Sequence, residues 1–163
     1  MAHIDANVDV SVRYWDSHTK IIKKRTKYCN VLTYHGIVNM LEWLSNVKDL
    51  GYIDKMGVGS TGAVVPECIT NTGFGNSNTG SNFITESILE RNKSVTISSG
   101  VGTAIYSATI SPEEANNFTW NELVLFSADL TAIARVVVDN PYPKDSTAGA
   151  TIQWTITLQE TIK

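Results

Sequence analysis

The feature that most constrains the fold is a run of strict alternation near the C-terminal end of the chain. In residues 151–158, Thr-Ile-Gln-Trp-Thr-Ile-Thr-Leu, every second side chain is apolar and the others carry hydroxyl or amide groups. Successive residues of an extended strand point to opposite faces, so this segment has one apolar face and one polar face. The pattern predicts a half-buried antiparallel strand with Trp154 on its buried face.

Further strands are predicted along the chain. Residues 9–15 alternate, and a polar turn at 16–19 leads to a new extended segment, which indicates a β-hairpin. Residues 94–98 and 103–110 flank a Ser- and Gly-rich turn and indicate a second hairpin. Strand character is also present in residues 52–59, 120–126 and 131–138. With about seven to nine strands and hairpin links, the sequence predicts a mainly β domain, either an antiparallel β-sandwich or a jelly-roll-like barrel.

One α-helix is predicted between Gly36 and Val47. The residues that recur there at spacings of three and four are Ile37, Met40, Leu41, Leu44 and Val47. Thr33 precedes this segment as a candidate N-cap. The helix is expected to pack across the sheet, with Trp154 in the core between sheet and helix. At helical spacing, Met40 and Trp43 are interpreted as core or rim residues rather than as a ligand site.

Two segments have too little apolar content to pack by themselves. Residues 1–7 are predicted to be a flexible N-terminal arm, and residues 71–82, Asn-Thr-Gly-Phe-Gly-Asn-Ser-Asn-Thr-Gly-Ser-Asn, a long exposed loop. Whether this loop binds a partner or is an unbound tip stays open. The charged run 22–27 is interpreted as a solvated strand edge.

Composition limits the class of protein. A chain of 163 residues, 42% of them hydrophobic, should bury roughly 70% of its unfolded surface, so residues 1–163 are expected to form a single domain. The net charge of −3 is too weak to predict a nucleic-acid partner. No apolar run approaches the ~18 residues of a membrane span, and the N-terminus does not resemble a secretory signal, so synthesis and folding in a cytosol are expected. Cys29 and Cys68 lack metal-ligand spacing and are interpreted as free thiols whose state stays open.

No catalytic or metal-binding motif is evident. The histidines, none of which has a partner at metal-ligand spacing, are His3, His18 and His35. Asp5 with Asp9, and Glu86 with Glu90, could pair as carboxylates, but neither pair has the ordered ligand loop of a calcium site. The glycines at 57–62 lack the Lys-Ser/Thr of a phosphate-binding loop. The sequence therefore predicts a non-enzymatic protein without cofactor or metal.

Four blocks follow one another in an order that is itself informative. They are Asn-Val-Leu-Thr-Tyr-His-Gly at 30–36, Met-Gly-Val-Gly-Ser-Thr at 56–61, residues 84–91 with Glu86 and Arg91, and a last block made of Trp-Asn-Glu-Leu-Val-Leu-Phe at 120–126, Ala134-Arg135, Lys144 and Gln-Trp-Thr-Ile at 153–156. In this order the blocks resemble a family of tailed-bacteriophage structural proteins of the tail-fibre or baseplate-related type. Two features depart from that family's pattern: the Glu86 to Arg91 spacing is longer, and Val124 replaces a glycine.

The resemblance implies a non-enzymatic, multicopy or homo-oligomeric virion subunit that contacts tail, baseplate or major capsid proteins. The tail, baseplate or fibre-attachment region is the first expectation, and capsid decoration on the head surface is the alternative. A carbohydrate-binding host-recognition module is the alternative from another class, with candidate sugar-stacking residues Tyr14, Trp15 and Tyr142. The candidate subunit contacts lie in the arm and the loop: Met1, Ala2, His3, Ile4, Asp5, Phe74, Asn76 and Asn78.

Overall fold

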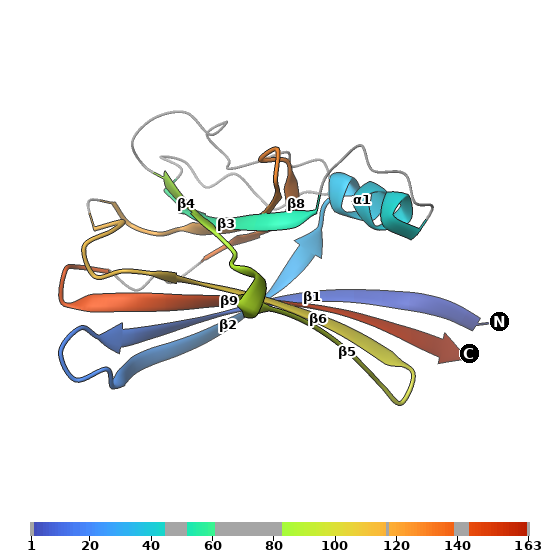
Figure 1. The fold of residues 1–163 in the computed structure, drawn as a ribbon, viewed down its shortest axis with the longest axis horizontal. Helices are drawn as coiled ribbons and strands as arrows, with labels where there is room; N and C mark the ends of the chain where they lie inside the picture. Colours follow the sequence, from blue (N-terminus) through green and yellow to red (C-terminus); the bar gives the residue numbers. More distant parts are fainter. Residues whose placement is uncertain (1, 45–51, 61–82, 117, 139–143, 163) are drawn as a thin grey trace.

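The described residues form a β-sandwich of two antiparallel layers with one short α-helix and a 3-10 turn at Glu90–Asn92 (Figure 1). The computed structural model describes residues 2–44, 52–60, 83–116, 118–138 and 144–162. The larger layer contains β1 (Ala2–Asp16), β9 (Ala148–Ile162), β6 (Val101–Ile110) and β5 (Lys93–Ser98). The smaller layer contains β4 (Phe83–Ser87), β3 (Ile53–Gly59), β7 (Glu122–Ser127) and β8 (Ala132–Val137).

The two layers are joined by β2 (Ile22–Leu32), and they are not closed into a barrel. β2 pairs with β1 from Ile22 to Asn30 and with β8 only through Val31 and Leu32. The strand order is β4-β3-β7-β8-β2-β1-β9-β6-β5, so β4 and β5 are the two edge strands. The sandwich expectation is therefore confirmed and the closed barrel is wrong.

Both predicted hairpins are confirmed. In the turn between β1 and β2, the Asp16 carboxylate accepts hydrogen bonds from the backbone amides of His18 at 3.0 Å and Thr19 at 2.9 Å. This side-chain bonding is the usual reason for an Asp at a turn. Between β5 and β6, Ser99 (φ 51°) and Gly100 (φ 77°) make a two-residue turn with positive φ, the geometry that matches the twist of paired strands.

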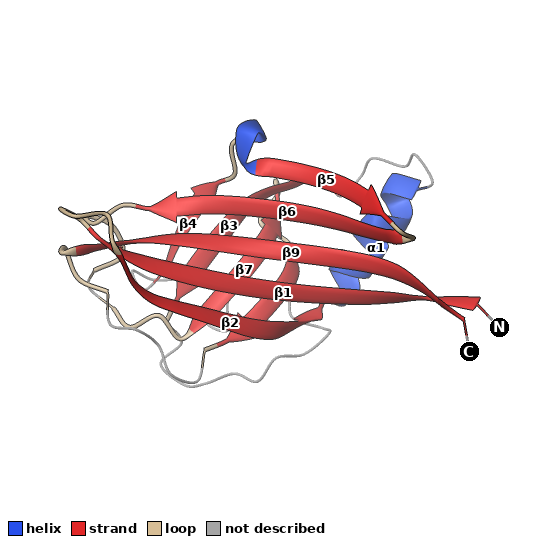
Figure 2. Ribbon diagram, turned by 90° about the horizontal axis from the view of Figure 1, so that it is seen from below, coloured by secondary structure: helices blue, strands red, loops and turns tan. Residues whose placement is uncertain are grey.

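The expectation of a flexible arm at residues 1–7 is wrong for residues 2–7. These residues begin β1 and pair with β9, from Ala2 opposite Ile162 to Asn7 opposite Thr157. Backbone hydrogen bonds to a neighbouring strand order a segment whatever its apolar content, and composition alone does not reveal that neighbour. Both ends of the chain consequently lie side by side at one end of the larger layer (Figure 2). Met1 and the loop 71–82 lie outside the described residues.

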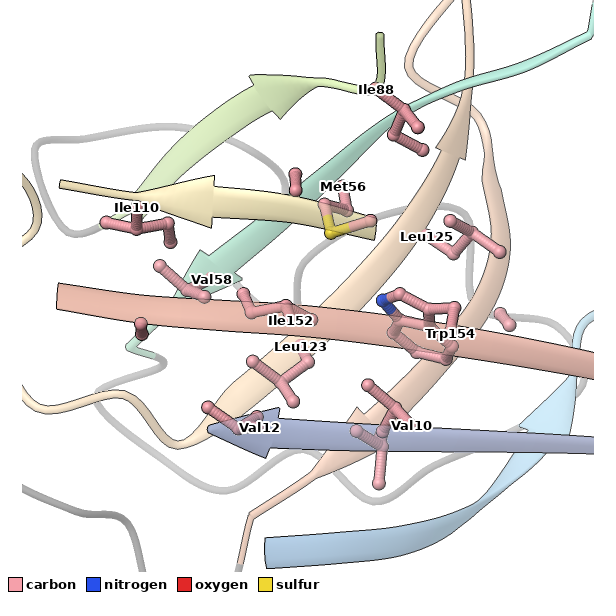
Figure 3. Packing of buried hydrophobic residues seen from close by; sticks show 14 of the residues in the cluster. Val10, Val12, Met56, Val58, Ile88, Ile110, Leu123, Leu125, Ile152 and Trp154 are labelled. Atoms are coloured by element: carbon pink, nitrogen blue, oxygen red, sulfur yellow. The ribbon is translucent and has the colours of Figure 1, made fainter. Parts of the chain in front are cut away.

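The alternation in β9 is confirmed. Ile152 and Trp154 are fully buried and Ile156 is almost so, whereas the intervening Thr and Gln side chains are only half-buried. The surroundings of Trp154 correct one detail, because the labelled side chains near it in Figure 3 come from strands of both layers, Val10 of β1 and Leu125 of β7 among them. Trp154 therefore fills the space between the two layers rather than between sheet and helix.

The helix α1 (Tyr34–Leu44) is present, but it starts two residues earlier than predicted and presents a different face; the predicted end at Val47 lies outside the described residues. Thr33 is its N-cap, since the Gly36 amide donates to Thr33 Oγ1 at 3.0 Å. Gly36 lies so close to β8 that a Cβ there would be 2.4 Å from the Ile133 carbonyl oxygen.

This close contact sets the rotation of α1. Met40 lies one turn after Gly36 on the same face and packs against the core. Ile37 and Leu41 lie a further ~100° round the helix, and they are 44% and 57% exposed. The predicted apolar face is thus wrong for these two residues. The side chains of Trp43 and Leu44, and all of Val47, lie outside the described part.

Replacing Trp154 by alanine should lower the free energy of unfolding by about 3–5 kcal/mol, because the vacated volume lies between two layers that cannot collapse freely. Leu158→Ala is the matched control, since Leu158 is on the same face of β9 but 39% exposed. Chemical denaturation of both variants measures the difference. Equal losses would contradict the assigned position of Trp154.

Candidate functional site

Tyr14, a predicted sugar-stacking residue, lies inside the protein. It continues the inward alternation of Val8, Val10 and Val12 along β1 and is only 4% exposed. Its ring packs against Trp120 with the ring centroids 5.8 Å apart. Tyr14 therefore has no surface on which a sugar could stack, and its assignment as a glycan residue is wrong.

Trp15 is half-buried and has contacts on its indole ring. The Lys20 ammonium lies 4.5 Å from the ring centroid, a cation–π distance. Trp15 is also opposite Gly149 in the register with β9, where a Cβ would be 2.1 Å from the indole Cζ2. Gly149 thus makes room for the indole, and the geometry favours a packing role. Tyr142, the third stacking candidate, lies outside the described residues.

The other candidate residues, namely the carboxylates, metal ligands and subunit contacts, do not come together as a site in the described residues. Glu90 pairs with Lys93 at 2.7 Å, and the pKa of Glu86 is raised first by burial and then by the charge of Glu114. In the described residues no three His, Cys, Asp or Glu side chains gather as metal ligands. Of the candidate contacts, Ala2, His3, Ile4 and Asp5 are in β1, and Phe74, Asn76 and Asn78 lie outside the described residues. No described helix is long and apolar enough to cross a membrane.

Glu122 and Arg135 form a buried ion pair across β7 and β8. Arg135 Nε donates to Glu122 Oε2 at 2.9 Å, and Arg135 Nη2 lies 2.9 Å from the same oxygen. Glu122 alternates with the core residues Leu123 and Leu125, so the pair lies on the face of the smaller layer that points away from the sandwich core. Both side chains are at most 1% exposed. Such a pair fixes strand register, because a displaced partner would leave a buried charge unpaired.

Lys144 stabilises the segment that links β6 to β7 through side-chain hydrogen bonds. Its Nζ donates to the carbonyl oxygens of Pro112 at 3.1 Å and Glu114 at 2.6 Å, and to Asn116 Oδ1 at 2.7 Å. Burial lowers the pKa of Lys144, and the nearby carboxylates, Glu114 foremost, act in the opposite direction. Three acceptors satisfy the three ammonium protons, which makes Lys144 a structural residue.

Among the described residues, one further feature with functional potential is an apolar groove at the open end of the sandwich, which we call the open-end groove. It has a volume of about 400 Å³ and is lined chiefly by Met40 of α1 and by Val95, Ile97, Ala104, Ile156 and Leu158 of the larger layer. Figures 1 and 2 both place α1 beside the end of this layer where β5 and β6 turn.

The open-end groove exists because the larger layer extends beyond the smaller one. Lys93, at the start of β5, still reaches β3, where its Nζ lies 3.6 Å from Asp54 Oδ1, and it also lies 5.1 Å from the Tyr52 ring centroid. Val95 and Ile97 follow Lys93 on the same face of β5. Val95 is 74% exposed and Ile97 is 83% exposed. The cover provided by the smaller layer therefore ends at Lys93.

Small residues give the groove its depth. Gly102 pairs with Ile97 on one side and Leu158 on the other, and Ala104 likewise lies between Val95 and Ile156. These two residues form a low floor in β6 between two rows of larger apolar side chains. Tyr106 lines the inner end of the groove, where burial raises the pKa of its phenol.

Sequence reasoning missed this site, although a signal for it exists in the hairpin of residues 93–110. The apolar alternation of Val95 and Ile97 was interpreted only as a strand. The detectable signal is the combination of that alternation with Gly102 and Ala104 in the facing strand. Two exposed apolar residues opposite residues with almost no side chain leave an apolar recess, and exposed apolar patches mark contact sites.

A scan against protein-family models, a search of curated proteins and a search of solved structures each gave no match to this chain. The candidate site therefore depends on its geometry alone.

Arg135→Ala should lower the free energy of unfolding by about 3–5 kcal/mol, because it leaves the Glu122 carboxylate buried without its cation. The double variant Glu122→Leu, Arg135→Met should lose much less, since it removes both charges while keeping apolar volume. Urea denaturation measures both. A double variant as unstable as Arg135→Ala would show that the loss does not come from an unpaired charge.

Glu114 should add stability that acid removes. Its pKa lies below the ordinary 4.5, first because the Ser111 amide and hydroxyl donate to its carboxylate and then because Lys144 is near. A lowered folded-state pKa means that this stabilisation is full above pH 4.5 and is lost as the pH falls through the folded-state pKa. The stability difference between Glu114 and Glu114→Gln chains should therefore shrink in acid, as thermal unfolding at several pH values will measure.

Both chains in this experiment should carry Glu86→Gln. The pKa of Glu86 is raised partly by Glu114, which gives a pH dependence of the opposite sign. A stability difference that stays constant as the pH falls below 4.5 would contradict the assigned role of Glu114.

Proposed function

We propose that this chain is a non-enzymatic structural subunit of a tailed-bacteriophage particle, placed in the tail, baseplate or fibre-attachment region and assembling through protein–protein contacts. The observation that carries the proposal is the open-end groove, an exposed apolar surface on an otherwise well-packed sandwich. Contiguous exposed apolar surfaces on soluble proteins mark contact sites. An apolar groove, here about 400 Å³ in volume, can take the apolar side chains of another protein segment.

The virion context comes from the ordered sequence blocks, and several of their residues hold this fold together. Thr33 caps α1 and Gly36 gives it close contact with β8. Glu122 and Arg135 form the buried pair, and Lys144 fastens the segment around Glu114. Structural roles for these residues are what a resemblance to structural proteins, rather than to enzymes, would lead one to expect.

Capsid decoration on the head surface uses the same kind of contact, so the groove is equally suited to a major capsid partner. The location in the particle distinguishes the two proposals. The carbohydrate-binding alternative gains no support from Tyr14 or Trp15, because the first is buried and the second is packed on Gly149 beneath Lys20.

The proposal is tested by locating the chain in purified particles and by altering the groove. We expect particle reconstruction to place the chain on the tail or baseplate, with the open-end groove against another subunit. Ile97→Glu should lower incorporation into particles at least tenfold, because it puts a charge into an apolar contact. Ile21→Glu is the matched control, since Ile21 is 67% exposed but lies in the turn between β1 and β2, away from the groove.

Absence of the chain from purified particles that contain the other structural proteins would contradict this function. A particle in which the groove faces solvent and Ile97→Glu is incorporated as well as Ile21→Glu would contradict the groove as the assembly contact. A position on the head surface would replace the tail assignment with capsid decoration.

A further inference from the structure

β5 is an edge strand, and its outer side is unpaired within the described part of the chain. It is the last strand in the order of the larger layer and pairs only with β6 (Figure 2). The backbone N–H and C=O groups on the outer edge of such a strand can accept another strand. The register of β5 with β6 runs without a shift from Lys93 opposite Tyr106 to Ser98 opposite Val101, so the outer groups follow in regular order.

β5 lacks the features that usually prevent strands from pairing edge to edge. Edge strands are commonly protected from unwanted pairing by a proline, a β-bulge, or a charged side chain near the middle of the strand. Residues 94–98, Ser-Val-Thr-Ile-Ser, contain no proline and no charge, and all five are exposed. The register with β6 is also free of a bulge. This edge is therefore open to a partner strand.

The sequence of β5 is symmetric about Thr96. Ser94 and Ser98 lie at equal distances from Thr96, and so do Val95 and Ile97. If two copies of β5 pair antiparallel about a two-fold axis at Thr96, Val95 of each copy lies opposite Ile97 of the other, and serine lies opposite serine. An interface between identical subunits about a two-fold axis needs this kind of self-complementarity. Cross-strand pairs of β-branched apolar residues stabilise such pairing.

We propose that the edge of β5 is the contact between two copies of this chain, with the two larger layers joined into one continuous sheet through antiparallel pairing at Thr96. This inference rests on the proposed assembly role and names the partner as a second copy. The occupant is a matching β5 because the sequence of this edge is complementary to itself.

Charge favours the same pairing. No charged residue lies between Ser94 and Gly100, so the pairing brings no like charges together. Lys93 falls opposite Ser99 of the second copy in this register. Its ammonium stays directed to its own subunit, held by Asp54 and Glu90. The pairing thus neither breaks an ion pair nor buries an unpaired charge.

The contact is small, which sets its expected strength. A strand of five residues is about 17 Å long, and pairing along it buries far less than the ~1,200 Å² of a stable interface. The dimer should therefore be weak and transient in solution. Many copies held in one particle would raise the effective concentration and populate the contact. Pairing also brings the two open-end grooves onto one face of the joined sheet, where they can meet a shared partner.

A cysteine at position 96 tests the register directly. Cα atoms of directly opposed antiparallel residues are about 4.5–5.5 Å apart, within the ~4.4–6.8 Å that a disulfide allows. Thr96→Cys should therefore form a disulfide-linked dimer of the full chain under mild oxidation. Thr103→Cys is the matched control, because Thr103 is the neighbour of Thr96 in β6 and lies one strand farther from the second copy. The unmodified chain gives the background from Cys29 and Cys68.

A charge exchange tests the pairing without oxidation. Val95→Lys and Ile97→Glu, each alone, should weaken self-association measured by sedimentation at least tenfold, because each places a charge against an apolar side chain. The double variant should restore it, since Lys at 95 then lies opposite Glu at 97 of the second copy on both sides of the axis. Both positions are highly exposed, so the variants should fold as the natural chain does, and circular dichroism checks this.

A dimer linked through position 96 and not through 103, together with rescue by the double variant, would support the β5 contact. Three results would overturn it: a monomer at ~0.5 mM with no Thr96→Cys dimer, equal linkage through positions 96 and 103, or no rescue by the double variant. Linkage of Thr96→Cys only to a different virion protein would assign the edge to that protein. Such a result would leave the proposed structural function standing, whereas absence of the chain from particles would reject that function whatever its state in solution.

Discussion

The fold depends on the position of β9 between β1 and β6. β9 pairs with β1 along its whole length, from Ala148 to Ile162, and with β6 over residues 150–159. Its inward side chains, Trp154 foremost, fill the space between the layers. Because one strand supplies both the central backbone pairing and the largest fully buried side chain among the described residues of its layer, strand register and core packing are set together. A shift of one residue would turn the polar face of β9 inward.

The parts of this structure that sequence could predict are those set by local periodicity and turn chemistry. The period of two in β9 gave the buried face of Trp154, and Asp16 and Gly100 marked two hairpin turns. The face of α1 could not be predicted, because Gly36 against the Ile133 carbonyl sets it, and this contact joins residues about 100 positions apart. The pairing of residues 2–7 with β9 was missed for the same reason.

The candidate site was harder to foresee than the fold. Glu122, Arg135 and Lys144 lie in noted sequence blocks, yet their partners follow from cross-strand and loop geometry. Tyr14 and Trp15 have the side chains of a sugar site but are placed by β1 in packing roles. Exposure of an apolar face depends on where a facing layer ends. No pattern within β5 alone contains that information.

The contacts of Lys93 have a mechanical consequence. Up to Lys93 this end of the larger layer is held by the contacts of Lys93 with Asp54 and Tyr52. Beyond that residue β5 is held by β6, which stays paired with β9 as far as Val101. A force applied at the turn near Gly100 would bend this end of the layer about the Lys93 contacts. Salt screens the partly exposed ionic contacts among them. The stiffness of this projecting end would thus depend on the ionic strength around it, while the interior of the sandwich stays equally rigid.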